Sequence, residues 1–494
     1  MKTDQPAQSS RITSGVILDV VRICFCLLGG ILLIAAGCNS GTDETGEEKK
    51  SETVIRKISV KMLVIGDESL GPVIKRQFSS RRDGEVELSE MTWDEFVAGD
   101  CQAASDTDVV IYPARRLGEL ASRDLLVPIN DDNTRFEEGH ERALLFSDRG
   151  QAVSWAGQQV AMSLGQTHWV TLYRSDVLKS VSGEPAETWS DFDKLVKRIS
   201  ESGNADLPKR IAIPTKGHWA GHSLMVRAAS AIRTPGKYST YFDVGSMQPL
   251  IATSPFQLSL QAWKDQVEAQ EAQEAQDPQQ ILADFRAGKI AVAVVPLNRH
   301  WLASGEGGAE LPEITIGGVP GWKSVFDGTR NSWTEQLPGA VLSVPQLGTC
   351  GMLASCSTGS SQKRNTLEVI SWMTSKKICS IVSVESANAG MSRKSHLGNA
   401  GKWLGDEWTA EQLTQYSDYL NEVNSGRRVM TTLRIPESDR YLDELDQAVR
   451  AVISSDADVA ESLTGVTTRW TEITNEIGME KQKMAYRQSE GMQQ

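Results

Sequence analysis

Runs of apolar residues alternate with amphipathic segments from residue 58 onward. ISVKMLVIG, at 58–66, starts with apolar residues at every second position and then becomes continuously apolar, as an inner strand of a covered sheet does. Further strands are predicted at 108–113 (DVVIYP), 210–214 (RIAIP) and 340–345 (AVLSVP). Strands separated by amphipathic helices predict an α/β fold with mainly parallel sheets.

Other segments repeat their apolar residues every three to four positions, which predicts helices. The sequence TWSD at 188–191 fits a capping box at the start of one of them. Residues 257–287, which include the repeat EAQEAQEAQD, predict a solvated helix that leads through a Gly turn into the buried strand of FRAGKIAVAVVP. Further helices are predicted at 362–376 and between 442 and 477, and the polar end, 481–494, is expected to be frayed.

The start of the chain has a different pattern. Residues 23–37 are free of charge and follow a basic segment, but a run of about 15 residues is short for a bilayer span, which needs roughly 20. The stretch LLIAAGCNS resembles a bacterial lipobox, with Ala35 in place of the usual Leu and Cys38 as the residue that receives acyl chains such as palmitate. Residues 1–37 are therefore predicted to be a lipoprotein signal peptide and the polar residues 38–57 a flexible tether. An ordinary cleaved signal and an uncleaved span are the alternatives.

The composition describes an ordinary globular protein of 494 residues, which is long enough for two cores. Its formal net charge of -13 argues against non-specific nucleic-acid binding, which depends on Lys and Arg to neutralise phosphates. Seven cysteines without a CxxC pair suggest neither a disulfide framework nor a zinc site. Cys350 and Cys356 are either a disulfide pair, if the compartment is oxidising, or buried thiols.

The motifs of common enzyme classes are missing from the sequence. It contains no GxSxG, HExxH or DxDxDG, and TPGKYS at 234–239 lacks the first Gly and the Ser or Thr of a phosphate-binding loop. His218 and His222 have the spacing to share a metal on one helix face, but without a third ligand nearby the simpler interpretation is loop histidines. We therefore expect no catalysis, no metal and no cofactor.

Four segments follow one another in an order that is more specific than any single motif. They are DVVIYPARRLGELASRDLLVPI, TLYRSDVLKSVSGEPAETWSDFDKLVKRI, FRAGKIAVAVV and a helix that ends in WMTSKK. In the LLVPI return, in residues 173–176 and in residues 187–189, the chain resembles the extracellular solute-binding proteins of ABC importers, the maltose-binding-like group. Its closing helices also look like those of that family, and the resemblance covers most of residues 58–480.

The resemblance implies a periplasmic-binding-protein type II fold, with two α/β lobes joined by a hinge that closes on a ligand. Lobe 1 is expected to combine 58–163 with 340–377. Lobe 2 is expected to combine 164–339 with 378–480.

A sugar site needs aromatic platforms and planar polar partners, because sugars expose flat C–H faces and a ring of hydroxyls. Several tryptophans lie at predicted turns or chain crossings rather than on helix core faces. The candidate ligand-binding residues are Trp169, Trp219, Trp301 and Trp333 as platforms, with Arg299 and His300 as hydrogen-bond donors. Core packing, or a surface position for the last two, is the simpler interpretation of each residue taken alone.

Together these features predict a monomeric, extracytoplasmic solute-binding protein held to a bacterial membrane by its N-terminal lipid. The expected ligand is a carbohydrate, and the expected partners are the permease subunits of an ABC importer. One alternative is a sensor or interaction lipoprotein that keeps the fold without serving a transporter. The other is a secreted enzyme acting on polysaccharides.

Overall fold

The computed structural model describes the chain between residues 57 and 492, with short gaps. The described ranges are 57–80, 84–129, 139–232, 239–270, 274–303, 312–328, 330–335, 346–347, 351–425, 430–455 and 457–492. Cys38, Cys350 and the strand predicted at 340–345 lie outside these ranges. In the part of the chain that is described, no helix is long and apolar enough to cross a membrane.

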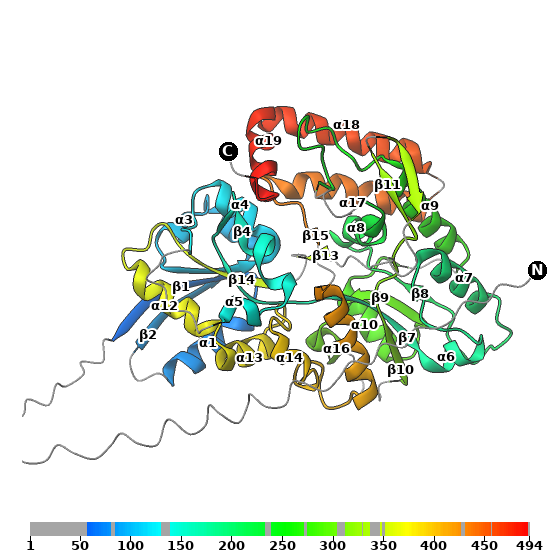
Figure 1. Cartoon of the computed structure of the whole chain (residues 1–494), viewed down its shortest axis with the longest axis horizontal. Coiled ribbons are helices and arrows are strands. Elements are labelled where there is room, and N and C mark those ends of the chain that lie inside the picture. Colours follow the sequence, from blue (N-terminus) through cyan, green and yellow to red (C-terminus); the bar gives the residue numbers. More distant parts are fainter. Residues whose placement is uncertain are drawn as a thin grey trace, which may run out of the picture. The chain divides into compact units, whose positions relative to one another are not determined.

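The first sheet combines early strands with one from much later in the chain (Figure 1). Its order is β2 (Gly84–Met91), β1 (Ile58–Ile65), β3 (Val109–Pro113), β14 (Gly351–Cys356) and β6 (Met162–Gln166). β1 runs parallel to β2 and β3, and β14 runs antiparallel to β3 and β6. The buried positions of β1 alternate at first and are then continuous, which confirms the strand predicted from ISVKMLVIG.

The second sheet has the order β10 (Ile314–Gly317), β7 (Trp169–Arg174), β9 (Val292–Pro296) and β8 (Ile211–Ala212). β8 and β9 are parallel, whereas β7 is antiparallel to both of its neighbours. The prediction of mainly parallel sheets is therefore wrong for this sheet. The reason is that only two residues, 167 and 168, separate β6 of the first sheet from β7 of the second. β7 therefore runs away from the segment that joins the two sheets, while β8 and β9 run toward it.

Three short strand pairs complete the β-structure of the described residues. They are β4 (Ser154–Trp155) with β5 (Gln158–Gln159), β11 (Ser324–Asp327) with β12 (Ser332–Glu335), and β13 (Gln346–Leu347) with β15 (Met430–Thr431).

Helices pack on both faces of each sheet, because successive strand residues point to opposite sides. Those that follow the strands of the first sheet are α1 (Leu70–Ser79), α2 (Trp93–Ala98), α3 (Gln102–Ser105), η1 (Ala114–Arg116), α4 (Leu117–Ser122), α12 (Lys363–Met373) and α13 (Lys376–Glu385). Those associated with the second sheet are α6 (Ser175–Ser180), α7 (Trp189–Ser200), α8 (Trp219–Ile232), α9 (Ser254–Glu268), α10 (Pro278–Arg286), α11 (Arg299–Ala303), α14 (Lys394–Leu397), α15 (Gly401–Leu404) and α16 (Ala410–Ser425). Short turns precede the crossing at α5 (His140–Ala143), η2 (Phe146–Asp148) and η3 (Gly150–Val153), and the chain ends in α17 (Ser438–Ser454), α18 (Val459–Ile477) and α19 (Met479–Ser489).

The capping signals decide where two of these helices begin. The Thr188 side chain accepts a hydrogen bond from the Asp191 amide, which confirms the predicted start of α7. The single helix predicted over 257–287 is wrong, because α10 begins anew at Pro278 with Asp277 as its N-cap. Proline lacks an amide hydrogen and disfavours a helical residue before it, so the Asp-Pro pair starts a second helix.

The C-terminal segment is not frayed, contrary to the prediction for 481–494. Residues up to Ser489 form α19, in which Tyr486 is 1% exposed. The Tyr486 hydroxyl accepts hydrogen bonds from three consecutive backbone amides, those of residues 240–242, at 3.2–3.3 Å. One aromatic ring with a buried polar end thus anchors a helix whose other residues are mostly polar.

The chain crosses from the first sheet to the second through residues 167–168, where polar groups are buried. The Asp148 carboxyl accepts hydrogen bonds from Ser163 Oγ at 2.5 Å and from Ser147 Oγ at 2.8 Å, and His168 Nε2 lies 3.1 Å from Ser147 Oγ. Burial raises the pKa of Asp148 to about 7, against the lowering effect of these hydrogen bonds.

A close approach of two backbones lies beside the crossing. Gly165 has a φ of +120°, and a Cβ added there would be 2.0 Å from the Gly390 carbonyl oxygen. Glycine is therefore required at this position both by its backbone conformation and by the space available.

Candidate functional site

Three of the four tryptophans that the sequence suggests as ligand platforms lie together at one edge of the second sheet. Trp219 follows the carboxyl end of β8, Trp301 follows the carboxyl end of β9, and Trp169 is at the amino end of the antiparallel strand β7. Their ring centroids are 6.1 Å apart for Trp169 and Trp219 and 6.4 Å apart for Trp219 and Trp301, both in edge-to-face geometry. The carboxyl ends of parallel strands are the usual place for a ligand in an open α/β sheet.

The three indoles differ in their access to solvent. Trp169 is 0% exposed and Trp219 is 8% exposed, while Trp301 is only partly buried. Trp169 Nε1 has no hydrogen-bond partner among the described residues. Of the three rings, Trp301 therefore has the most surface open to solvent, and Trp169 has none.

Two histidines adjoin this aromatic group. The His218 ring lies 4.8 Å from that of Trp219 and 5.4 Å from that of His222. His222 is part of α8, not of a loop as predicted; its Nδ1 donates to the His218 carbonyl oxygen and its Nε2 lies 3.2 Å from Thr432 Oγ1. Burial lowers the pKa of His222 to about 4. Over the described ranges no three His, Cys, Asp or Glu side chains are placed to hold a metal ion.

The first sheet contributes two arginines from η1, at the carboxyl end of β3. The Arg116 guanidinium lies over the Trp93 ring at 4.2 Å and forms an ion pair with Asp439 of α17. Arg115 is within electrostatic reach of His218, whose pKa is lowered to about 2, first by burial and then by Arg115, His222 and Arg116. The charges of η1 at the carboxyl edge of the first sheet therefore act on a histidine that adjoins the aromatic group of the second.

Sequence reasoning missed Arg115, and it considered His218 only as a metal ligand or a loop histidine. A signal for both was available, since each follows a strand that the apolar pattern predicts correctly, at 108–113 and at 210–214. Ligand-binding residues commonly occupy that position in α/β sheets.

The other three candidates are engaged elsewhere. Trp333 Nε1 donates to Ser254 Oγ at 3.1 Å, and its ring lies 5.7 Å from that of Trp322 in a separate aromatic pair. An Arg299 guanidinium nitrogen donates to the carbonyl oxygen of residue 402 at 2.9 Å. His300 Nε2 lies 2.9 Å from the carbonyl oxygen of residue 384. The structure therefore brings Trp169, Trp219 and Trp301 together but directs these three side chains to other contacts.

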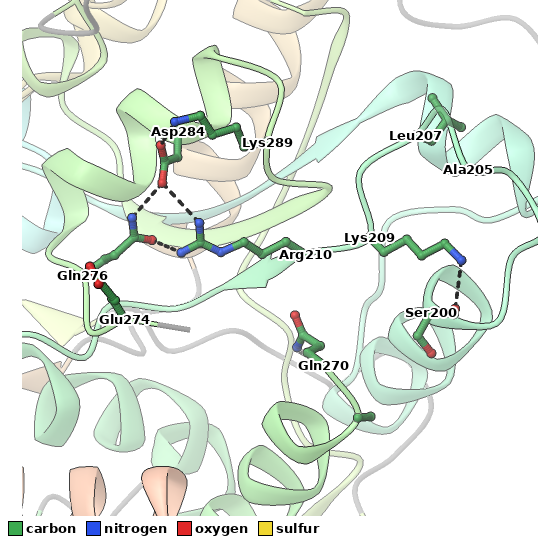
Figure 2. A pocket seen from close by; sticks show the side chains of 11 residues that line it. Ser200, Ala205, Leu207, Lys209, Arg210, Gln270, Glu274, Gln276, Asp284 and Lys289 are labelled. Carbon is green, nitrogen blue, oxygen red and sulfur yellow. Dashed lines mark hydrogen bonds and ion pairs between the residues drawn. The ribbon is translucent and has the colours of Figure 1, made fainter. Parts of the chain in front are cut away.

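A pocket of about 710 Å³ lies at the amino ends of β8 and β9, the opposite edge from the tryptophans (Figure 2). One side of it is lined by the Asp284 carboxylate, which pairs with Arg210 at 3.1 Å and Lys289 at 2.9 Å and accepts a hydrogen bond from Gln276 Nε2 at 2.7 Å. Burial acts to raise the pKa of Asp284, but Lys289, Gln276 and Arg210 together outweigh it and lower the pKa. Because these charges satisfy one another, the pocket has less to offer a solute than the aromatic group.

Solved structures share this fold at low sequence identity. The ABC transporter solute-binding protein of Agrobacterium radiobacter K84, in complex with ribitol, is 15% identical with a TM-score of 0.61, covering 85% of this chain and 99% of that one. The cyclic alpha-maltosyl-1,6-maltose binding protein of Arthrobacter globiformis is 13% identical with a TM-score of 0.61, covering 85% and 100%. Maltose-bound MalE3 of T. maritima is 16% identical with a TM-score of 0.59, covering 84% and 99%.

These structures share the two-lobed architecture, in which each sheet with its helices forms one lobe. No curated protein sequence matches the chain significantly. The family model described as bacterial extracellular solute-binding protein matches residues 74–380, which is more than half of the chain. The chain therefore belongs to the bacterial extracellular solute-binding protein family.

Proposed function

We propose that this protein binds a carbohydrate between its two lobes and delivers it to an ABC importer. The observation that carries the proposal is the group formed by Trp169, Trp219 and Trp301 at the carboxyl edge of the second sheet. Indole rings match the flat C–H faces of sugars, and the polar edges of His218 and Arg115 complement their hydroxyls. Members of the fold in complex with ribitol, mannitol and maltose support this ligand class.

The predicted lobes, 58–163 with 340–377 and 164–339 with 378–480, keep this division in the proposal except at two boundaries, because β6 continues to Gln166 in the first sheet and α13, to Glu385, packs on that sheet. In this proposal the protein acts as a monomer without catalysing a reaction. Cys38, after signal cleavage, carries the lipid that keeps the protein near its transporter. Mass spectrometry of the mature N-terminus should find an acylated Cys38. An unmodified Cys38, or a start elsewhere, contradicts the anchor but not the ligand site.

Titration of intrinsic tryptophan fluorescence with a panel of sugars, oligosaccharides and polyols tests the ligand site. At least one compound should bind, and Trp301→Ala should weaken its binding by about tenfold or more, equivalent to about 1.4 kcal/mol. Trp372→Ala is the matched control, since Trp372 is also a partly buried tryptophan on a helix but packs on Phe78 in the first lobe. Binding of no compound, or equal effects of the two substitutions, would refute the proposed site.

A further inference from the structure

The turn that opens α8 carries the middle ring of the aromatic group. Trp219 is the first residue of α8, and its ring lies edge to face with those of Trp169 and Trp301, with centroids 6.1 and 6.4 Å away. The first amides of a helix have no carbonyl partner within that helix, so the start of α8 depends on other groups for its position. A shift of this turn would move Trp219 and separate the three rings.

Two side chains of α17 hold this turn on either side of Trp219. Asp446 Oδ1 accepts a hydrogen bond from the Gly221 amide at 2.5 Å, and the Arg450 guanidinium donates one to the Gly217 carbonyl oxygen at 2.5 Å. Asp446 and Arg450 are four residues apart, which places them on the same face of the helix. The backbone is thus held two residues before Trp219 and two residues after it.

The two helices approach each other closely at this contact. A Cβ added at Gly221 would be 3.2 Å from Asp446 Oδ1 and 3.2 Å from the Leu445 side chain. α17 is in turn held by α18, because the Tyr441 hydroxyl lies 3.1 Å from Thr474 Oγ1 and both side chains are fully buried. The turn of α8 therefore rests on a support that is itself fixed, as a precise binding site requires.

Packing alone does not explain a carboxyl group at position 446. Asp446 is 1% exposed, and its Oδ2 has no hydrogen-bond partner among the described residues. Burial raises the pKa of this carboxyl to about 7. Its burial therefore costs free energy that an apolar side chain of similar size would not cost. What the carboxyl supplies is an acceptor at a fixed point for an amide close to Trp219.

We propose that Asp446 and Arg450 are positioning residues of the carbohydrate site, which set the affinity for the solute by fixing residues 217–221 and so the place of Trp219 beside Trp301. This inference rests on the proposed function. A turn that is already fixed loses little freedom when the solute binds, so the affinity is higher than for a turn that binding must first order.

Hydrogen exchange and calorimetry on the full-length protein test the two parts of this inference. Without any saccharide, Asp446→Ala and Arg450→Ala should each increase the amide exchange of residues 216–222, measured by mass spectrometry. Isothermal titration then uses the member of the panel of sugars, oligosaccharides and polyols, with maltose, ribitol and mannitol among them, that binds the wild type most tightly. Its affinity should be about tenfold weaker in each variant.

A conservative variant and a control separate positioning from general stability. Asp446→Asn keeps an oxygen that can accept from the Gly221 amide and should retain the wild-type affinity within about threefold. Tyr441→Phe removes the hydroxyl contact of the same helix with Thr474 and should lower the melting temperature without changing the affinity. If Asp446→Ala does not fold, Arg450→Ala gives the same comparison at a side chain that is only partly buried.

The outcomes separate this inference from the proposed function. If the exchange of residues 216–222 or the affinity is unchanged in the alanine variants, the positioning role is refuted while the carbohydrate site stands. The same holds if Tyr441→Phe weakens binding as much as they do. An affinity as weak in Asp446→Asn as in Asp446→Ala would refute the part played by the hydrogen bond. If no saccharide binds the wild type, the carbohydrate site is wrong and this inference fails with it.

Discussion

The buried Asp148 carboxyl at the crossing between the lobes should make folding stability depend on pH. Its hydrogen-bond donors, Ser147 and Ser163, are neutral, and burial raises its pKa to about 7. In the unfolded chain the pKa of an aspartate is about 3.9. The folded protein therefore binds a proton between about pH 4 and pH 7 that the unfolded chain has already released.

The sign and size of the effect follow from this difference. Protonated Asp148 gives full stability below about pH 4, and that stability is lost as the pH rises through about 7, the pKa in the folded state. A difference of about three pKa units, at about 1.4 kcal/mol each, sets an upper limit of about 4 kcal/mol. Asp148→Asn keeps a neutral side chain of the same shape and should remove this dependence.

Urea unfolding of the wild type and of Asp148→Asn at several values between pH 4 and pH 8 measures the difference. Buried histidines such as His168, whose pKa is lowered to about 4, act in the opposite direction in both proteins, so the difference between the two curves isolates Asp148. The wild type should lose stability relative to the variant as the pH rises, while the exposed-site control Asp406→Asn should run parallel to the wild type. A difference between wild type and Asp148→Asn that stays constant over this range would refute the reasoning.

Two further substitutions test other contacts. Tyr486→Phe removes the hydroxyl oxygen that accepts hydrogen bonds from the amides of residues 240–242. It should lower the free energy of unfolding by about 1–3 kcal/mol, measured by urea unfolding. An unchanged urea midpoint would mean that water replaces the hydroxyl. Gly165→Ala forces a Cβ against the Gly390 carbonyl oxygen and should lower the melting temperature by many degrees or prevent folding. Gly203→Ala is its control, since a Cβ there has no atom within 4 Å, and equal melting temperatures for the two variants would contradict the close approach.

Local patterns predicted those parts of the fold that local forces determine. β1, β3 and the capped start of α7 agree with the sequence because alternation, continuous apolar runs and the Thr188 cap act within a few residues. The antiparallel placement of β7 and the insertion of β14 between β3 and β6 depend on partners far away in the chain. No periodicity within either strand contains that information.

In the candidate site, too, some features follow from local sequence patterns and others depend on contacts between distant parts of the chain. Trp169, Trp219 and Trp301 became candidates because they lie at a predicted crossing or in the turns after predicted strands, and the antiparallel course of β7 brings the first of them to the same edge as the other two. Trp333 met the same criterion, but its indole N–H has a partner in Ser254 that only the folded chain reveals. The effect of Arg115 on the pKa of His218 depends on how the two sheets are placed in the folded chain, which the sequence alone does not predict.

The contacts of α19 with distant parts of the chain have a consequence for the order in which those parts fold. Gln151 Nε2 donates to the carbonyl oxygen of Ser489, a residue 338 positions later, and the Tyr486 hydroxyl holds a loop of the second lobe. Contacts between such distant residues form slowly, because the intervening chain must first be brought together. Until α19 is in place its contacts with both parts of the chain are missing, so we expect the surfaces that it covers to remain exposed, and prone to aggregation, late into folding.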